Sequence, residues 1–288
     1  MKVALCFWGL TRSLKYTIDS IREFIFKPLK SNKIEYIIFM HTFTFSSTYY
    51  NPRANESNVQ LDFNEHYLLE PDFLKIDDQD LIKSQIQVEK YRTLPDPWDS
   101  EYICVDNFLC AMFSKKQLGI MVNESNIQFD YVVYLRPDVR YINNIKPKFF
   151  NIIKNNSICT PNYQLFPKLN DRLAILNYCD LTKYSEMFDD MYEYSLKTPL
   201  HSERFQYYIL TQRFNWTVLY IPIWFNRVRA NGHEEQDTKS ILRKKYPKHI
   251  FDSKPTLNNT INKPVTFTNP TQPIFQKRKS KNIQESKV

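Results

Sequence analysis

Glycine is scarce in this sequence, since only Gly9, Gly119 and Gly232 occur among its 288 residues. Glycine-rich phosphate loops of the Walker or dinucleotide type need several flexible backbone positions, so the sequence excludes them. Any phosphate group that this protein binds must therefore be held mainly by side chains.

Cysteine pairs and long apolar runs are also missing. The five cysteines include no Cys-x-x-Cys pair and lie in or beside apolar segments. This placement predicts buried free thiols in a reducing compartment instead of disulfides or a zinc site. The apolar run at residues 3–10 has no small-residue cleavage site, and no apolar stretch reaches 18 residues. We therefore expect a soluble, cytoplasmic protein without a transmembrane segment.

The positive charge is concentrated at the C-terminal end. The formal net charge is +8, and residues 253–288 contain seven Lys or Arg and one acidic residue, which leaves +2 for residues 1–252. We expect a folded domain over residues 1–252 and a basic, disordered tail over residues 253–288. The tail is either a solvated extension or a contact for an acidic membrane or partner. A nearly neutral domain argues against nucleic acid as a partner, because phosphate neutralisation requires a basic surface.

Apolar runs typical of buried strands alternate with helical patterns along the chain. Strands are expected at residues 3–8, 35–40, 129–135, 158–160 and 216–225, and a long loop at residues 46–60. Helices are expected at residues 13–29, 78–91, 101–122, 180–196 and 202–214, the last with Ser202 as its N-cap. This alternation predicts an α/β fold, with a mostly parallel central sheet in a Rossmann-like, three-layer α/β/α arrangement.

Polar residues directly follow three of the predicted strands. Ligands of parallel sheets bind at the carboxyl ends of the strands, so we expect these residues to converge in space. They are Gly9, Arg12, His41, Thr42, Arg136, Asp138 and Arg140.

Asp138 follows a proline and lies between two arginines, just beyond a buried strand. Its carboxylate could coordinate a divalent metal that bridges two phosphates. The guanidinium groups of Arg12, Arg136 and Arg140 could pair with a diphosphate through planar, bidentate donors. The alternative is structural, with Asp138 capping a turn and forming an ion pair with Arg136 or Arg140.

Several short motifs follow one another along residues 1–232. They are Cys6-Phe-Trp-Gly-Leu-Thr-Arg12, Met40-His41-Thr42, Phe129-Asp130-Tyr131-Val-Val-Tyr134-Leu135-Arg136-Pro137-Asp138, Asn170-Asp171-Arg172-Leu173-Ala174-Ile175 and His201-Ser202-Glu203, with a late arginine at Arg227 or Arg229. In this order they resemble a family of GT-A-type glycosyltransferases found in viruses, bacteria and algae.

The resemblance implies a GT-A-like transferase that takes a nucleotide-diphosphate sugar as donor and a glycan as acceptor. Asp138 stands where the family has its Asp-x-Asp metal motif, and the other residues that follow the strands would contact the donor. Because only one carboxylate is present here, the sequence leaves open whether Mn²⁺ or Mg²⁺ is required. An arginine can neutralise diphosphate charge in place of a metal.

Two downstream carboxylates, Asp171 and Glu203, are candidates for the general base that deprotonates the acceptor hydroxyl. Each has a structural alternative. Asp171 could fix a loop before a strand, and Glu203 could complement the dipole of the helix that it begins. His41 is either a donor contact or a hydrogen-bonded structural group. Trp98, Trp216 and Trp224 either stack on a sugar or a base, or pack in the core.

Three functions remain open beside glycosyl transfer. The fold also supports a nucleotidyltransferase or a catalytically inactive relative that binds nucleotide sugars, because fold does not determine function. The basic tail could instead serve a nucleic-acid or membrane-surface protein. If the protein is viral, its location would be the host cytoplasm or the virion.

Overall fold

The first strand, β1 (Lys2–Trp8), lies in the middle of the central sheet, between β6 (Tyr131–Leu135) and β2 (Glu35–Thr44). Residues 3–8 are all buried, because both faces of the strand are covered. The computed structural model describes residues 1–46, 48–239, 241 and 276–277.

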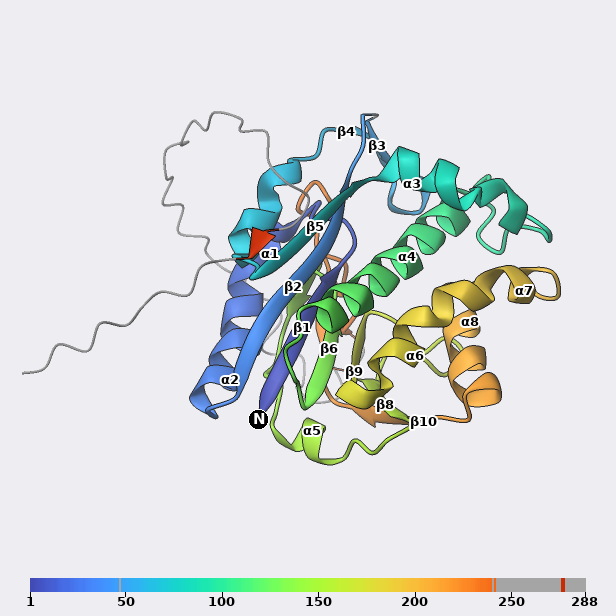
Figure 1. Ribbon diagram of the computed structural model, residues 1–288. Coiled ribbons are helices and arrows are strands. Elements are labelled where there is room, and N and C mark those ends of the chain that lie inside the picture. The colour runs from blue at the N-terminus through green and yellow to red at the C-terminus, as the bar shows by residue number, and fades with distance from the viewer. Residues whose placement is uncertain (47, 240, 242–275, 278–288) are drawn as a thin grey trace, which may run out of the picture.

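The central sheet is mostly parallel, as predicted (Figure 1). From one edge to the other, its described strands are β10 (Thr217–Ile221), β8 (Ser157–Pro161), β9 (Leu173–Asn177), β6, β1, β2, β5 (Phe73–Asp78) and β12 (Gln276–Lys277). Only β9 and β12 run against the others, since the pairings of β9 with β6 and β8, and of β12 with β5, are antiparallel. The reversed direction of β9 brings its amino end to the carboxyl end of β6.

Helices cover both faces of the sheet, which confirms the three-layer arrangement (Figure 1). Val3, Leu5 and Phe7 pack toward α1 (Leu14–Ile21), α2 (Lys27–Ser31) and α5 (Lys148–Asn151). The alternate side chains of β1 pack on the other face, toward α4 (Ile103–Glu124), α6 (Leu181–Ser185) and α8 (Ser202–Tyr208). This division follows from the period of two in a strand, which sends successive side chains to opposite faces.

Several predicted helices are interrupted or begin elsewhere. A π-helical turn (Arg22–Phe26) separates α1 from α2, and a 3₁₀ turn (Glu186–Asp190) separates α6 from α7 (Met191–Ser195). The prediction of Ser202 as an N-cap was wrong. The cap position belongs to His201, and the Ser202 hydroxyl donates to the Glu203 carboxylate instead.

The segment predicted as a loop at residues 46–60 contains a small hairpin, β3 (Tyr49–Asn51) and β4 (Glu56–Val59). Its turn includes Asn55 with φ of 51°, a left-handed conformation that asparagine tolerates. A second short pair joins β7 (Val139–Tyr141) to β11 (Phe225–Arg227). Strands of three or four residues are too short to show a period in the sequence, so the pattern missed both pairs.

Between the hairpin and α4, the chain forms β5 and then α3 (Gln79–Ile86). The Asp78 carboxylate caps α3 by accepting hydrogen bonds from the backbone N–H groups of Asp80 and Leu81. This capping agrees with the helix start predicted near residue 78.

Two expectations concern the ends of the chain and its thiols. Of the predicted tail, Gln276–Lys277 pair through their backbone with β5, and the rest of residues 253–288 lies outside the described residues. All five cysteines are free, but Cys179 is exposed, which corrects the prediction that all five are buried. Within the described ranges, no helix has the length and apolarity needed to cross a bilayer.

Candidate active site

A cavity of about 750 Å³ opens where β1 and β6 end. Its volume lies in the range of small-molecule binding sites. The predicted convergence at this edge is confirmed for four residues that follow the strands, and the two downstream carboxylates join them. These lining residues are Gly9, Arg12, Arg136, Asp138, Asp171 and Glu203.

Asp138 is the shared acceptor of two arginines in the wall of this cavity. Arg12 donates from Nε and Nη2 to Oδ2 over 3.1 and 2.6 Å. Arg136 donates from Nε to Oδ1 over 2.7 Å and also from Nη2 to Oδ2. Burial alone would raise the pKa of Asp138, but the two guanidinium groups hold it well below its ordinary value. Asp138 is therefore ionised, and it fixes the orientation of both arginines.

The predicted role of Asp138 as a metal ligand does not fit this geometry. Both carboxylate oxygens already accept from guanidinium groups, and a divalent ion there would lie against two fixed positive charges. In the part of the chain that the structure describes, no three His, Cys, Asp or Glu side chains are grouped to hold a metal. Asp138 is thus the ion-pair partner that the structural alternative expected, with Arg12 as its second arginine.

Gly9 adopts a φ of +88°, in the left-handed region that favours glycine. Its backbone N–H donates to the Ser114 hydroxyl over 3.0 Å and to the backbone carbonyl of His41 over 3.2 Å. No atom beyond its chain neighbours lies within 4 Å of an added Cβ, so the requirement for glycine here is conformational and not steric.

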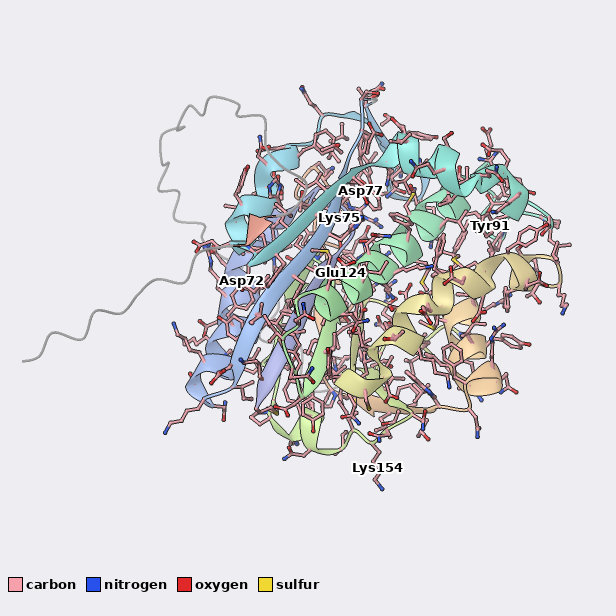
Figure 2. All side chains as sticks on the ribbon, viewed as in Figure 1. Asp72, Lys75, Asp77, Tyr91, Glu124 and Lys154 are labelled. Carbon is pink, nitrogen blue, oxygen red and sulfur yellow. The ribbon has the colours of Figure 1, made fainter. Side chains whose placement is uncertain are left out.

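His41 is completely buried and does not line the cavity. Its Nδ1 lies 2.8 Å from the Ser114 hydroxyl, and its Nε2 lies 3.0 Å from the carboxylate of Asp77. Asp77 and Lys75, both labelled on β5 in Figure 2, are also paired, at 3.7 Å. Burial lowers the pKa of His41, so the ring is neutral. His41 therefore fits the structural interpretation. Its backbone carbonyl and its partner Ser114 both accept hydrogen bonds from the Gly9 N–H.

Two further predicted donor contacts also lie away from the cavity lining. Thr42 is buried at an exposed fraction of 1%. Arg140 faces outward from β7 and forms an ion pair with Glu234 at 2.9 Å. Asp138 lies just before β7 and Arg140 lies within it, so strand alternation does not relate the directions of their two side chains.

Asp171 and Glu203 form a pair of carboxylates with opposite pKa shifts. Burial opposes ionisation of Asp171, but Arg172 and then Lys115 and Arg136 lower its pKa. Burial and the negative charge of Asp171 raise the pKa of Glu203. The two carboxyl groups therefore differ in how readily they take a proton, as acids with different roles in acid–base chemistry do. Asp171 is the member that holds its proton less tightly.

An aromatic wall, defined as Trp98, His201 and Phe166, adjoins these carboxylates in the cavity lining. The ring centroids of Trp98 and His201 are 4.8 Å apart, and those of His201 and Phe166 are 4.9 Å apart. His201 Nδ1 lies 3.3 Å from Glu203. Burial, followed by the charge of Arg204, lowers the pKa of His201 to about 4, so its ring is neutral at neutral pH. None of the three rings of the aromatic wall therefore carries a charge at neutral pH.

Sequence reasoning missed two buried donors in the lining. The indole Nε1 of Trp8 and the Nε of Arg172 have no hydrogen-bond partner within the described ranges. Buried donors are normally paired, so these two atoms are exceptions, although neither is itself exposed to the cavity. Their signal was present in the sequence, because Trp8 precedes Gly9 and Arg172 follows Asp171.

The cavity carries an excess of positive charge. Its lining contains six arginines and four carboxylates, which leaves a net charge of +2 if all are ionised. Arg53 forms no ion pair with a carboxylate in the described part of the chain, and its guanidinium lies 5.6 Å from the centroid of Trp98. An anionic ligand is therefore favoured. The arginines are Arg12, Arg53, Arg136, Arg172, Arg227 and Arg229, and the carboxylates are Asp138, Asp171, Glu203 and Glu235.

No family model matches the sequence, and no curated protein matches it. Solved structures similar in fold include a glycosyltransferase involved in the glycosylation of the major capsid of PBCV-1, at 9% identity, with 76% of this chain and 80% of that chain covered and a TM-score of 0.38. Mouse xyloside xylosyltransferase 1 has 10% identity, coverage of 77% and 85%, and a TM-score of 0.39. The galactosyltransferase LgtC, solved with donor and acceptor sugar analogs, has 12% identity, coverage of 76% and 73%, and a TM-score of 0.40. Identities and scores this low assign no activity, which has to follow from the chemistry of the cavity itself.

Proposed function

We propose that this protein is a glycosyltransferase that moves a hexose or a pentose from a nucleotide-diphosphate donor to a glycan acceptor. The observation that carries the proposal is the meeting of two kinds of group in one cavity. The arginine pair Arg12 and Arg136 offers fixed cationic donors, and Asp171 and Glu203 offer carboxyl groups whose pKa values shift in opposite directions. A diphosphate leaving group and a proton acceptor are what such a transfer requires.

The donor diphosphate binds at Arg12 and Arg136 in this proposal. Each guanidinium presents planar N–H donors and stays charged at all relevant pH values. Asp138 holds both groups in position before the ligand arrives, so little reorganisation is needed when charge develops on the leaving group. The same arginines carry the charge neutralisation that a metal would otherwise supply.

The chemical step uses Asp171 as general base. The acceptor hydroxyl oxygen attacks the anomeric carbon of the donor sugar while Asp171 takes the hydroxyl proton. The bond from the anomeric carbon to the diphosphate oxygen breaks, and the electron pair leaves with the nucleoside diphosphate toward Arg12 and Arg136. The aromatic wall, which adjoins Glu203, offers apolar ring surface for the acceptor sugar.

Ligand-dependent thermal stability tests the donor class. The full chain is heated with a panel of nucleoside diphosphates and nucleotide sugars, in the presence of Mn²⁺ or of EDTA. A ligand at one hundred times its Kd stabilises the folded state by about 2.7 kcal/mol, which is visible as a higher Tm. We expect at least one nucleotide sugar to raise the Tm equally with Mn²⁺ and with EDTA.

The variant Arg136→Ala should lose this stabilisation, whereas Arg140→Ala, whose side chain lies outside the cavity lining, should keep it. The proposal fails if no nucleoside diphosphate or nucleotide sugar stabilises the wild type. Stabilisation by a nucleoside triphosphate alone would favour a nucleotidyltransferase. Binding of a nucleotide sugar without turnover on any glycan tested would indicate an inactive relative.

A cytoplasmic location is part of this proposal, since sugar nucleotides are its substrates and its thiols are free.

A further inference from the structure

Lys115, in the second half of α4, is buried to an exposed fraction of 1%, although lysine is rarely buried unless it is paired. It forms no ion pair with a carboxylate anywhere in the described residues. Its ammonium nitrogen donates instead to neutral oxygens, at 2.8 Å to Gln206 Oε1 and at 3.2 Å to the backbone carbonyl of Asp171. The Tyr184 hydroxyl lies at 3.5 Å. These partners accept hydrogen bonds, so the geometry requires the lysine as a donor.

The contacts of Lys115 reach Asp171 by two routes. The first is direct, through the Asp171 carbonyl. The second passes through Gln206, whose Oε1 accepts from Lys115 and whose Nε2 donates to Asp171 Oδ2 at 3.4 Å. Because the amide of Gln206 can face in two ways, the bond from Lys115 selects the orientation that turns its NH₂ group toward the carboxylate. Both the backbone and the side chain of Asp171 therefore depend on Lys115.

Charges on several sides act on this buried amine. Burial lowers the pKa of Lys115 to about 8, with Arg136 acting in the same direction, while Asp171 and Glu203 raise it. At neutral pH the ammonium form predominates. The ring of Trp8 has its centroid 4.6 Å from this nitrogen and lines the cavity, whereas Lys115 is not among the lining residues. Lys115 thus acts from behind the cavity wall without touching a ligand itself.

We propose that Lys115 is a positioning residue that holds Asp171 in its ionised, ligand-facing arrangement, directly and through Gln206. The inference rests on the proposed function only where it takes Asp171 to be the base. It assigns a role to a buried amine that the chemical step does not otherwise use. A purely structural lysine would support folding without affecting how readily Asp171 takes a proton.

Lys115→Met tests this with a side chain of similar length that lacks the charge. Asp residues are labelled with ¹³C at the carboxyl carbon, and the Asp171 resonance is identified by its absence in Asp171→Asn. Removal of a nearby positive charge disfavours the carboxylate, so the titration midpoint of Asp171 should move to higher pH. The matched control is Lys116→Met on the same helix. Lys116 pairs with Asp189 at the surface, and its removal should leave the Asp171 titration unchanged.

Gln206→Leu keeps the lysine and removes only the second route. It should also raise the titration midpoint of Asp171, by less than Lys115→Met, and it serves if the lysine variant does not fold. Once a donor that the enzyme turns over is known, kcat can be compared as well. We expect kcat to fall roughly 10- to 100-fold in Lys115→Met and KM for the donor to stay within about threefold of the wild-type value. This pattern is expected for loss of an interaction made in the transition state.

An Asp171 titration that is the same in the wild type, Lys115→Met and Gln206→Leu would overturn the positioning role. If Lys115→Met does not fold, an Asp171 titration in Gln206→Leu that equals the wild type overturns the positioning route through Gln206. A shifted titration in a protein that binds no nucleotide supports the positioning role and rejects the proposed function. The two proposals are therefore tested separately.

Discussion

His41 Nδ1 lies 2.8 Å from the Ser114 hydroxyl, and Asp77 lies 3.0 Å from the other ring nitrogen. The order Ser, His, Asp is that of a nucleophilic triad. Both Ser114 and His41 are completely buried, however, and the serine oxygen already accepts from the backbone N–H of Gly9. The three side chains therefore brace the turn that follows β1, and they have no route to a substrate.

Removal of the Ser114 hydroxyl should destabilise the protein. Ser114→Ala leaves His41 Nδ1 without its partner and leaves the Gly9 N–H only the backbone carbonyl of His41, and an unsatisfied buried polar group costs about 1–3 kcal/mol. Urea unfolding measures this difference. Ser84→Ala, at an exposed position of α3, is the control and should change stability by less than about 0.5 kcal/mol. A Ser114→Ala protein as stable as the wild type would contradict the bracing role.

Arg136 should contribute strongly to anion binding. Arg136→Ala removes charge-assisted hydrogen bonds worth about 1.5–3 kcal/mol, which corresponds to roughly 10- to 150-fold weaker binding of a nucleoside diphosphate. Calorimetric titration measures the Kd. Arg140→Ala, which removes the same charge from the outer side of β7, should leave the Kd within about twofold. Equal losses in both variants would mean that binding depends on general positive charge.

Asp138 should make stability depend on acid pH. Its lowered pKa means that its stabilising effect is complete above the unfolded-state value of about 3.9 and is lost as the pH falls further toward the folded-state value. Asp138→Asn should lose about 3–5 kcal/mol at pH 7, because two partly buried guanidinium groups lose a buried counter-charge. Its unfolding free energy should also fall less steeply below pH 4 than that of the wild type.

Unfolding by urea at pH 7 and at pH 3 checks both statements. Asp189→Asn, which removes a surface carboxylate paired with Lys116, is the control, with an expected loss below about 1 kcal/mol. If Asp138→Asn and Asp189→Asn behave alike at both pH values, the two arginines do not depend on Asp138 as described.

Asp171 and Glu203 should respond differently to loss of charge. Asp171→Asn should lower kcat roughly 10²- to 10⁴-fold, the usual contribution of a general base. Glu203→Gln removes a neighbouring negative charge, so the pKa of Asp171 falls further and the acid limb of the kcat/KM profile moves to lower pH. Glu193→Gln, exposed on α7, should leave the profile in place. A kcat that falls roughly 10²- to 10⁴-fold in Glu203→Gln but stays near the wild-type value in Asp171→Asn would show that Glu203 is the base.

Gly119 lets α4 approach α6 closely. An added Cβ would lie 2.3 Å from both Cβ and Oγ of Ser185, far inside van der Waals contact. Gly119→Ala should therefore cost about 1–3 kcal/mol of stability through overpacking. Adding Ser185→Gly removes the clashing atoms, and a double-mutant cycle should show recovery of part of that loss. Strictly additive effects of the two substitutions would mean that the residues do not clash.

Much of the site could be predicted because the rule for parallel sheets is geometric. Gly9 and Arg12 after one strand, and Arg136 and Asp138 after another, had to meet once the two strands were neighbours. The rule gives the place of a backbone, however, and not the direction of each side chain. His41 lies within β2, which extends to Thr44 and so beyond its predicted end, and its ring is buried in the interior.

Lys115 and Lys116 have different environments that their residue type alone could not predict. The two are adjacent and chemically identical, but one is buried and the other pairs with a surface carboxylate. The helical period carried a signal, since Lys115 lies three residues after Met112 and three before Leu118, which are both buried. A lysine in the apolar phase of a helix is unfavourable unless its donors are satisfied, and those partners come from segments far along the chain.

The reversed direction of β9 has a consequence for protein engineering. Arg12 and Arg136 follow strands of the first half of the chain. Asp171, which precedes β9, and the aromatic residues Phe166 and His201 lie in the second half. Apart from Trp98, which the first half contributes to the aromatic wall, the two sides of the cavity can therefore be varied in separate gene segments. Libraries confined to residues 164–172 and 201–203 would sample new acceptors while leaving Arg12 and Arg136 untouched.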